Sequence, residues 1–170
     1  YMNASLSVSF SLCLCLCCIY YARSRYEVDP ASELGWVTAT DPTRGSGLVF
    51  GYCWKRADYP WISLWCCSRD DGYMSRGIEF GTTGLHKPFP MLAKHPTLFG
   101  LPTFHVLDAQ ESQTRGYAMF LAEVPEQYAG QVTGVSKVVM DGDQLTLTLT
   151  RGAEDQESVT VNLPTAGVAL

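Results

Sequence analysis

Apolar and polar residues alternate along most of this chain, with a period of two residues instead of the 3.6 of a helix. The alternation is clearest at Leu145, Leu147 and Leu149, each of which is followed by a threonine. Successive side chains of a strand point to opposite faces, so such a segment forms a strand with one buried face. No stretch with a helical period reaches a usable length. The pattern therefore predicts an all-β protein with negligible helix.

Turn signals separate these segments into short strands at regular spacing. The expected strands after the N-terminal region are Trp36–Thr40, Leu48–Trp54, Trp61–Ser68, 76–81, Thr103–Ala109, Tyr117–Val124, Gly134–Met140, Asp143–Thr150 and Ser158–Leu163. The strand at Trp61–Ser68 is apolar on both faces, which is typical of the middle of a sheet. Asp141-Gly142 has the residues of a two-residue type I′ turn and predicts a hairpin. Strands of this number and spacing predict an antiparallel β-sandwich.

The N-terminal segment is open to three interpretations. Residues 5–18 alternate serine or cysteine with apolar residues, which favours a long strand. Residues 6–22 also form an uncharged run before Arg23, so a membrane or signal segment is an alternative, and a segment without a native fold is the third. We therefore expect an apolar segment at 1–26 and a sandwich domain at 27–170. Membrane contact is expected only through 6–22, and the protein is expected in the cytoplasm unless that run is an anchor or signal.

Composition and charge narrow the function classes. The chain has 170 residues, 46% of them hydrophobic and 17% charged, which describes a globular protein. Its net charge is −5 and its basic residues form no run, so nucleic-acid binding has no electrostatic basis. The seven cysteines are odd in number and lack the paired spacing of zinc ligands. We expect no metal site, and we expect mostly free, buried thiols in a reducing compartment.

One stretch carries candidate chemistry, the predicted strand at 76–81 and the loop that follows it. Ile78 and Phe80 share one face with the stem of Arg76, and Glu79 lies on the other face between two glycines. Glycine inside a strand often marks the close approach of a ligand or backbone. A carboxylate at a strand end beside a polar loop is a common functional position, although a solvent-facing edge glutamate would have the same pattern.

This stretch resembles the strand that carries the general base of galactose mutarotase-like proteins, the family of aldose 1-epimerases. The resemblance extends over about residues 33–165, through the motifs Gly51-Tyr-Cys-Trp54, Tyr59-Pro-Trp61 and Leu98-Phe-Gly100, and corresponds to the C-terminal half of the family's domain. It implies a large antiparallel sandwich, a small-molecule sugar as ligand and no cofactor. It also implies acid/base interconversion of sugar anomers, with Glu79 as the base.

The acid and the sugar contacts are assigned on weaker grounds. The family places a histidine upstream of the glutamate, whereas the three histidines here, His86, His95 and His105, all follow Glu79. His86 lies in the loop directly after the strand and can fold back over Glu79, so it is the candidate acid. Arg76 can contact a substrate oxygen or pair with a carboxylate. The tryptophans Trp54, Trp61 and Trp65 are candidate sugar platforms, although core packing is the commoner use of such rings.

Three functions of different kinds follow from these residues. The chain is a sugar epimerase acting through Glu79, or a carbohydrate-binding sandwich without catalysis, or a half-domain without independent activity. A half-domain would expose strand edges, and such edges pair with other copies to form homo-oligomers. The sequence leaves these three open.

Overall fold

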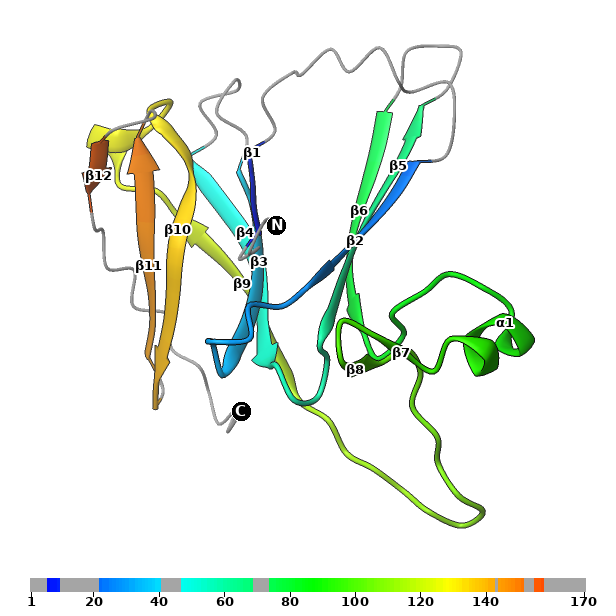
Figure 1. Cartoon of the computed structure of the whole chain (residues 1–170). Coiled ribbons are helices and arrows are strands. Elements are labelled where there is room, and N and C mark those ends of the chain that lie inside the picture. The colour runs from blue at the N-terminus through cyan, green and yellow to red at the C-terminus, as the bar shows by residue number, and fades with distance from the viewer. Residues whose placement is uncertain are drawn as a thin grey trace. The chain divides into compact units, whose positions relative to one another are not determined.

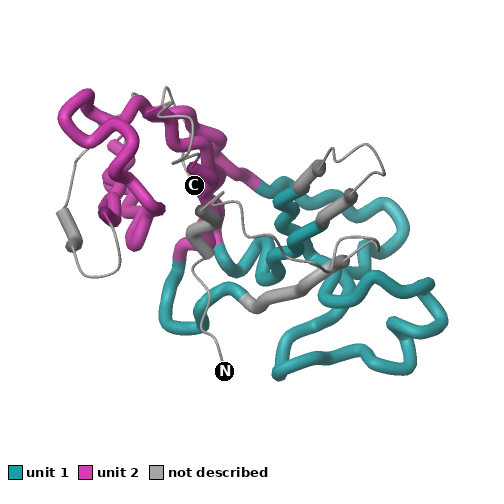
Figure 2. Tube along the Cα trace, turned by 90° about the horizontal axis from the view of Figure 1, so that it is seen from above, with its two compact units in different colours: residues 1–4, 15–33, 56–115 teal, residues 5–14, 34–55, 116–170 magenta. Residues whose placement is uncertain are grey.

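The computed structural model describes residues 6–9, 22–40, 47–68, 74–142, 144–151 and 155–157. These residues gather into two compact units (Figure 2). Unit 1 contains residues 22–33, 56–68 and 74–115, and unit 2 contains 6–9, 34–40, 47–55, 116–142, 144–151 and 155–157. Neither unit is one continuous segment. Both units include described residues from before and from after residue 26.

Unit 1 is built on a three-stranded antiparallel sheet with the order β2-β5-β6 (Figure 1). Its strands are Ala22–Glu27 (β2), Trp61–Ser68 (β5) and Met74–Gly81 (β6). The prediction that Trp61–Ser68 lies in the middle of a sheet is confirmed. Ile62 pairs with Tyr26 on one side and with Phe80 on the other, and it is completely buried. The strand can be apolar on both faces because neighbours cover both of its edges and much of each face.

A short helix, α1 (Phe89–Lys94), and a hairpin of two-residue strands, β7 (Thr97–Leu98) and β8 (Leu101–Pro102), follow the sheet of unit 1. The helix has only six residues and was not expected. Pro90 lies in its first turn, where the missing N–H of proline is not needed, and Leu92 is its buried residue. Within the described residues no helix combines the length and the apolar character that crossing a membrane requires.

The strand expected at Thr103–Ala109 does not form, and that prediction is wrong. Thr103 is completely buried, but its hydrogen bonds go to loops instead of a neighbouring strand. Its N–H bonds to Pro96, its carbonyl accepts from Gly84, and its hydroxyl donates to the carbonyl of His95 at 2.7 Å. Both backbone groups of Thr103 are already bonded to loops in this way. They are therefore not available to pair with a neighbouring strand.

Unit 2 contains a sheet of order β1-β3-β4-β9 and a second sheet of order β10-β11-β12. The strands of the first sheet are Leu6–Ser9 (β1), Leu34–Thr40 (β3), Leu48–Lys55 (β4) and Tyr117–Glu123 (β9). Those of the second are Val132–Asp141 (β10), Gln144–Arg151 (β11) and Asp155–Glu157 (β12). The all-β prediction is confirmed. One pairing departs from a purely antiparallel arrangement, because β1 runs parallel to β3 with Leu6 opposite Val37.

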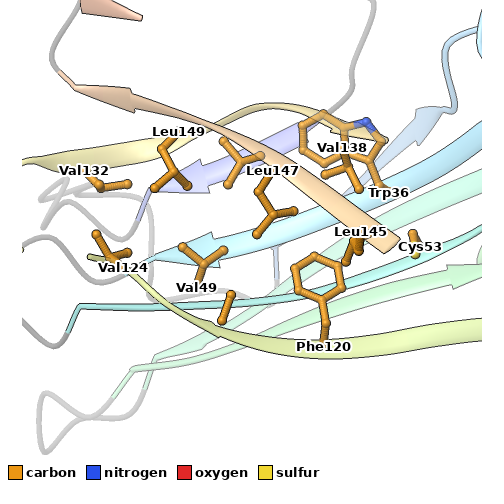
Figure 3. Packing of buried hydrophobic residues seen from close by; sticks show 12 residues of the cluster. Trp36, Val49, Cys53, Phe120, Val124, Val132, Val138, Leu145, Leu147 and Leu149 are labelled. Carbon is orange, nitrogen blue, oxygen red and sulfur yellow. The ribbon is translucent and has the colours of Figure 1, made fainter. Parts of the chain in front are cut away.

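The core of unit 2 lies between these two sheets (Figure 3). Leu145, Leu147 and Leu149 of β11 are at most 1% exposed, as their alternation with threonine predicted. They pack with Val49, Cys53 and other residues of the facing sheet, completed by Trp36, Phe120, Ala122, Val124, Val132, Val135 and Val138. Burial of such apolar side chains contributes ~25 cal/mol per Å² and is the main stabilising term of the unit.

Strand β4 turns its smaller residues toward this core. Val49, Gly51 and Cys53 face the second sheet. The larger residues that alternate with them, Leu48, Phe50, Tyr52 and Trp54, lie on the opposite face. Gly51 pairs with Phe120 of β9, and a Cβ built on Gly51 would lie 2.4 Å from the Phe120 ring and 2.8 Å from the Val37 carbonyl. The ring therefore occupies the space that any side chain at position 51 would need.

The predicted hairpin exists, but its turn is displaced by one residue. Asp141 pairs with Gln144, so Asp141 belongs to the strand and the turn begins at Gly142. Gly142 has φ of 54°, a value that the first central residue of such a turn requires and that glycine adopts without strain. The third strand of this sheet is β12, and the predicted strand Ser158–Leu163 lies outside the described residues.

The described part of the N-terminal run, Leu6–Ser9, is a strand, in agreement with the strand interpretation. The rest of the run lies outside the described residues. Among the cysteines, Cys53 is free and buried, as expected, and burial raises the pKa of its thiol from 9.0 to about 11.

We predict that Leu147→Ala lowers the free energy of unfolding by ~2–5 kcal/mol, because it leaves a cavity in the core between the sheets. Leu121→Ala is the matched control. Leu121 is 60% exposed on β9, and its truncation is expected to change stability by no more than ~0.5 kcal/mol. Urea unfolding of the three proteins measures both values, and equal losses would contradict the assignment of the core.

We also predict a pH dependence from Cys53. The unfolded thiol loses its proton near its ordinary pKa of 9.0 while the folded one keeps it up to about 11. Below pH 9 the thiol is protonated in both states, so stability is unaffected, and between pH 9 and 11 the free energy of unfolding falls as pH rises. At 1.36 kcal/mol per pH unit, the loss is ~2–3 kcal/mol. The Cys53→Ala variant lacks this contribution, so parallel pH profiles of the two proteins would contradict the prediction.

Candidate functional site

The pairing of β5 with β6 places Ser63 directly opposite Glu79 in unit 1. Residues that face each other across an antiparallel pair lie on the same side of the sheet. On this side Trp61, Ser63 and Trp65 of β5 therefore accompany Glu79 of β6. Ser63 is 1% exposed, whereas the side chain of Glu79 is 52% exposed. The sheet thus presents a carboxylate to solvent beside a buried hydroxyl.

The two glycines that flank Glu79 have different surroundings. Gly77 lies opposite Trp65, and a Cβ on Gly77 would be 3.3 Å from the Trp65 ring, so this ring covers the glycine. Gly81 has open space, because the nearest atom to its Cβ position is the Thr83 nitrogen at 3.9 Å. The expectation that glycine leaves room beside the carboxylate therefore holds at Gly81. At Gly77 the Trp65 ring fills this space, and the ring lies next to Glu79.

The loop after β6 is fixed to the sheet through Trp61. Trp61 is 1% exposed, and its indole Nε1–H donates to the Pro102 carbonyl at 2.9 Å. Gly84 lies on this ring so closely that a Cβ would be 2.7 Å from the indole Cε2. The Gly84 N–H also donates to the Thr103 carbonyl at 2.9 Å. The loop is held at its middle, two residues before His86.

This anchor brings His86 over the Ser63–Glu79 pair. Its Nε2 lies 3.3 Å from the Ser63 hydroxyl oxygen and 3.8 Å from Oε2 of Glu79. The side chain of His86 is 35% exposed. Of the residues predicted for catalysis, Glu79 and His86 are therefore brought together. Ser63 was not predicted, because its position opposite Glu79 follows from the register between β5 and β6, which the local sequence does not state.

The geometry decides what this cluster can do. A separation of 3.8 Å is too long for a hydrogen bond, but it allows a charge pair when the imidazole is protonated. A nucleophilic triad needs the acid on the ring nitrogen that does not contact the serine. Here Ser63 and Glu79 approach the same nitrogen, and Ser63 is buried. The cluster therefore fits proton transfer by Glu79 and His86, with Ser63 holding the ring.

The other residues predicted for the site are three tryptophans and Arg76. Trp54 is completely buried with its ring across Gly35, and Trp61 is buried under Gly84, so both are core residues in this structure and present no ring face to a sugar. Trp65 is half-buried and stays next to Glu79. The backbone of Arg76 pairs with Cys66, and its side chain lies outside the described part of the structure.

The other two histidines do not join this cluster. His95 ends α1, where its N–H bonds to the carbonyls of Met91 and Leu92. His105 is exposed in the irregular segment after β8. In the described ranges no three His, Cys, Asp or Glu residues are grouped so that they could hold a metal ion.

No family model matches the chain, and neither a curated protein nor a solved structure is significantly similar to it. The resemblance to galactose mutarotase-like proteins therefore stays a hypothesis.

We predict that Gly84→Ala disrupts this site, because the added methyl group would overlap the Trp61 ring at 2.7 Å and the loop would have to move. Overpacking of this kind costs ~1–3 kcal/mol. Gly81→Ala is the matched control, since its Cβ meets nothing closer than 3.9 Å. Thermal unfolding and the NMR signals of the His86 ring report the two effects. Unchanged His86 signals in a folded Gly84→Ala variant would contradict the role of this contact.

Proposed function

We propose that this protein binds a small sugar and interconverts its anomers, with Glu79 as general base and His86 as general acid. The observation that carries the proposal is the 3.8 Å separation between Glu79 Oε2 and His86 Nε2 on a partly exposed face. The anomeric carbon of a sugar ring bears both the hydroxyl that must lose a proton and the ring oxygen that must gain one. A base and an acid that serve two oxygens on one carbon have to be close neighbours, and these two groups are.

The reaction needs no group beyond these two. Glu79 accepts the proton of the anomeric hydroxyl while the C1–O5 bond breaks, and its electron pair stays on O5. The protonated His86 donates a proton to O5, which yields the open-chain aldehyde. Rotation about the C1–C2 bond and the reverse proton transfers close the other anomer. In this closing step His86 takes back the proton from O5 and Glu79 gives its proton to the new anomeric oxygen, so both groups return to their starting states.

Ser63 has a positioning role in this proposal. Its hydroxyl contacts His86 Nε2 at 3.3 Å and is itself held in a buried strand position. A hydroxyl can donate or accept, so it can follow the change of the imidazole between its neutral and protonated forms. It therefore keeps the ring near Glu79 in both states.

Sugar binding without catalysis is the second candidate, and Trp65 favours it. Its half-buried ring lies diagonally from Glu79 on the same face. An aromatic ring beside a carboxylate provides both a surface for C–H groups and an acceptor for hydroxyls. This arrangement binds sugars whether or not His86 takes part.

We predict that the full chain accelerates the exchange between α and β anomers of a common hexose over buffer alone. Glu79→Gln keeps the shape of the side chain but cannot accept a proton, so it should lower the rate by ~10²–10⁴-fold. Glu123→Gln is the matched control, because Glu123 is an exposed strand carboxylate in unit 2. Polarimetry after dissolving a pure anomer measures all three rates.

The outcomes separate the two candidates. Acceleration that is lost in Glu79→Gln and kept in Glu123→Gln supports the epimerase. If tryptophan fluorescence shows hexose binding but the wild type gives no acceleration, the protein is the binding module. A wild type that neither binds nor accelerates any hexose up to millimolar concentration would rule out both.

A further inference from the structure

A pocket with two arginines lies in unit 1, formed by segments that are far apart in the sequence. Its open volume is about 150 Å³, and its lining includes Arg56, Thr82, Phe104, His105 and Arg115. A single water needs only ~10–15 Å³ of such space, so the pocket has room for a small molecule. The sequence assigned none of these residues to a site, and in the structure each lies in a turn or a loop.

Both guanidinium groups are fixed by contacts to the protein backbone. Arg56 donates through Nε to the Val28 carbonyl at 3.1 Å. Arg115 donates to the Asp58 carbonyl and, at 2.9 Å, to the side-chain oxygen of Gln113. The Arg115 guanidinium also lies over the Tyr59 ring, 5.7 Å from its centroid. Groups held in this way lose little freedom when a ligand binds, which favours affinity.

These contacts do not neutralise the positive charge of Arg115. Its partners are a carbonyl, an amide and an aromatic ring, and among the described residues it has no carboxylate partner. They use two of the five N–H donors of a guanidinium. The described residues that line the pocket include no acidic side chain. In a chain with a net charge of −5, this pocket is a local concentration of positive charge.

The other walls of the pocket are mostly apolar. Pro60, Leu101, Pro102 and Phe104 supply hydrocarbon surface, and the exposed His105 and the half-buried Thr82 add polar side chains to the lining. A free inorganic ion would leave this apolar surface uncovered. A ligand with one oxyanion and a compact carbon body would use both parts.

We propose that this pocket binds a small organic anion, with its phosphate or carboxylate between Arg56 and Arg115 and its carbon body against Phe104. The forked donors of arginine suit the oxygens of either group. This site goes beyond the sugar chemistry proposed for Glu79 and does not depend on it.

The test is a titration of the full chain with phenyl phosphate, benzoate and the neutral benzyl alcohol. Calorimetry gives the affinities, and amide NMR shifts locate the site. We expect at least one anion to bind with shifts centred on residues 56–60, 82 and 101–105, and no binding of the alcohol. A preference for phenyl phosphate or for benzoate tells which oxyanion the site takes. Arg115→Gln should weaken binding by ~10–100-fold, which is the loss in affinity expected when hydrogen bonds to a charged group are removed.

Two further variants, Lys94→Gln and Arg115→Lys, complete the experiment. Lys94→Gln removes the same charge from an exposed helix position outside the pocket lining and should leave the affinity unchanged. If Arg115→Gln does not fold, Arg115→Lys retains the charge and lacks the fork, and it should still bind at least tenfold more weakly. Absence of anion binding at millimolar concentration, equal binding of benzyl alcohol, or NMR shifts centred elsewhere would overturn the proposal.

Discussion

The candidate site depends on the contact between Trp61 and Gly84. The buried indole of Trp61 leaves no space for a side chain at position 84 and donates its N–H to the Pro102 carbonyl at 2.9 Å. These interactions hold the loop after β6 against the sheet, two residues before His86. A packing contact in the interior of unit 1 therefore positions the loop that carries one of two titratable groups at its surface, and Ser63 holds the ring of that group.

Packing of an aromatic ring over a glycine recurs in both units. Trp54 lies across Gly35, Phe120 across Gly51 and Trp65 across Gly77, each glycine being the cross-strand partner of the aromatic residue. A ring laid over a glycine of the next strand fills the space of the missing side chain and fixes the register of the pair. This use explains why a chain rich in tryptophan presents few of those rings to solvent. It also explains why glycines inside the strands do not weaken the sheets as isolated glycines would.

Much of the fold was predictable because the alternation of side chains is a local property. The central position of Trp61–Ser68, the buried face of Leu145, Leu147 and Leu149, and the face of Glu79 all follow from a period of two. The errors have tertiary causes. Thr103 bonds to loops instead of a strand, and the hairpin turn moves by one residue because Asp141 pairs with Gln144. The role of Ser63 and the burial of Trp54 and Trp61 depend on which residues pack against them from other parts of the chain. The local sequence pattern does not determine those partners.

We propose that the loop anchored on Trp61 makes Glu79 and His86 act as one pair. The most direct measurement is a double-mutant cycle on anomer exchange with Glu79→Gln, His86→Gln and the double variant. Groups that act as a unit are strongly non-additive, since losing either one removes most of the benefit of the other. We expect the double variant to be about as slow as the slower single variant. A double variant whose loss equals the product of the two single losses would show that the groups act independently, and it would contradict the account.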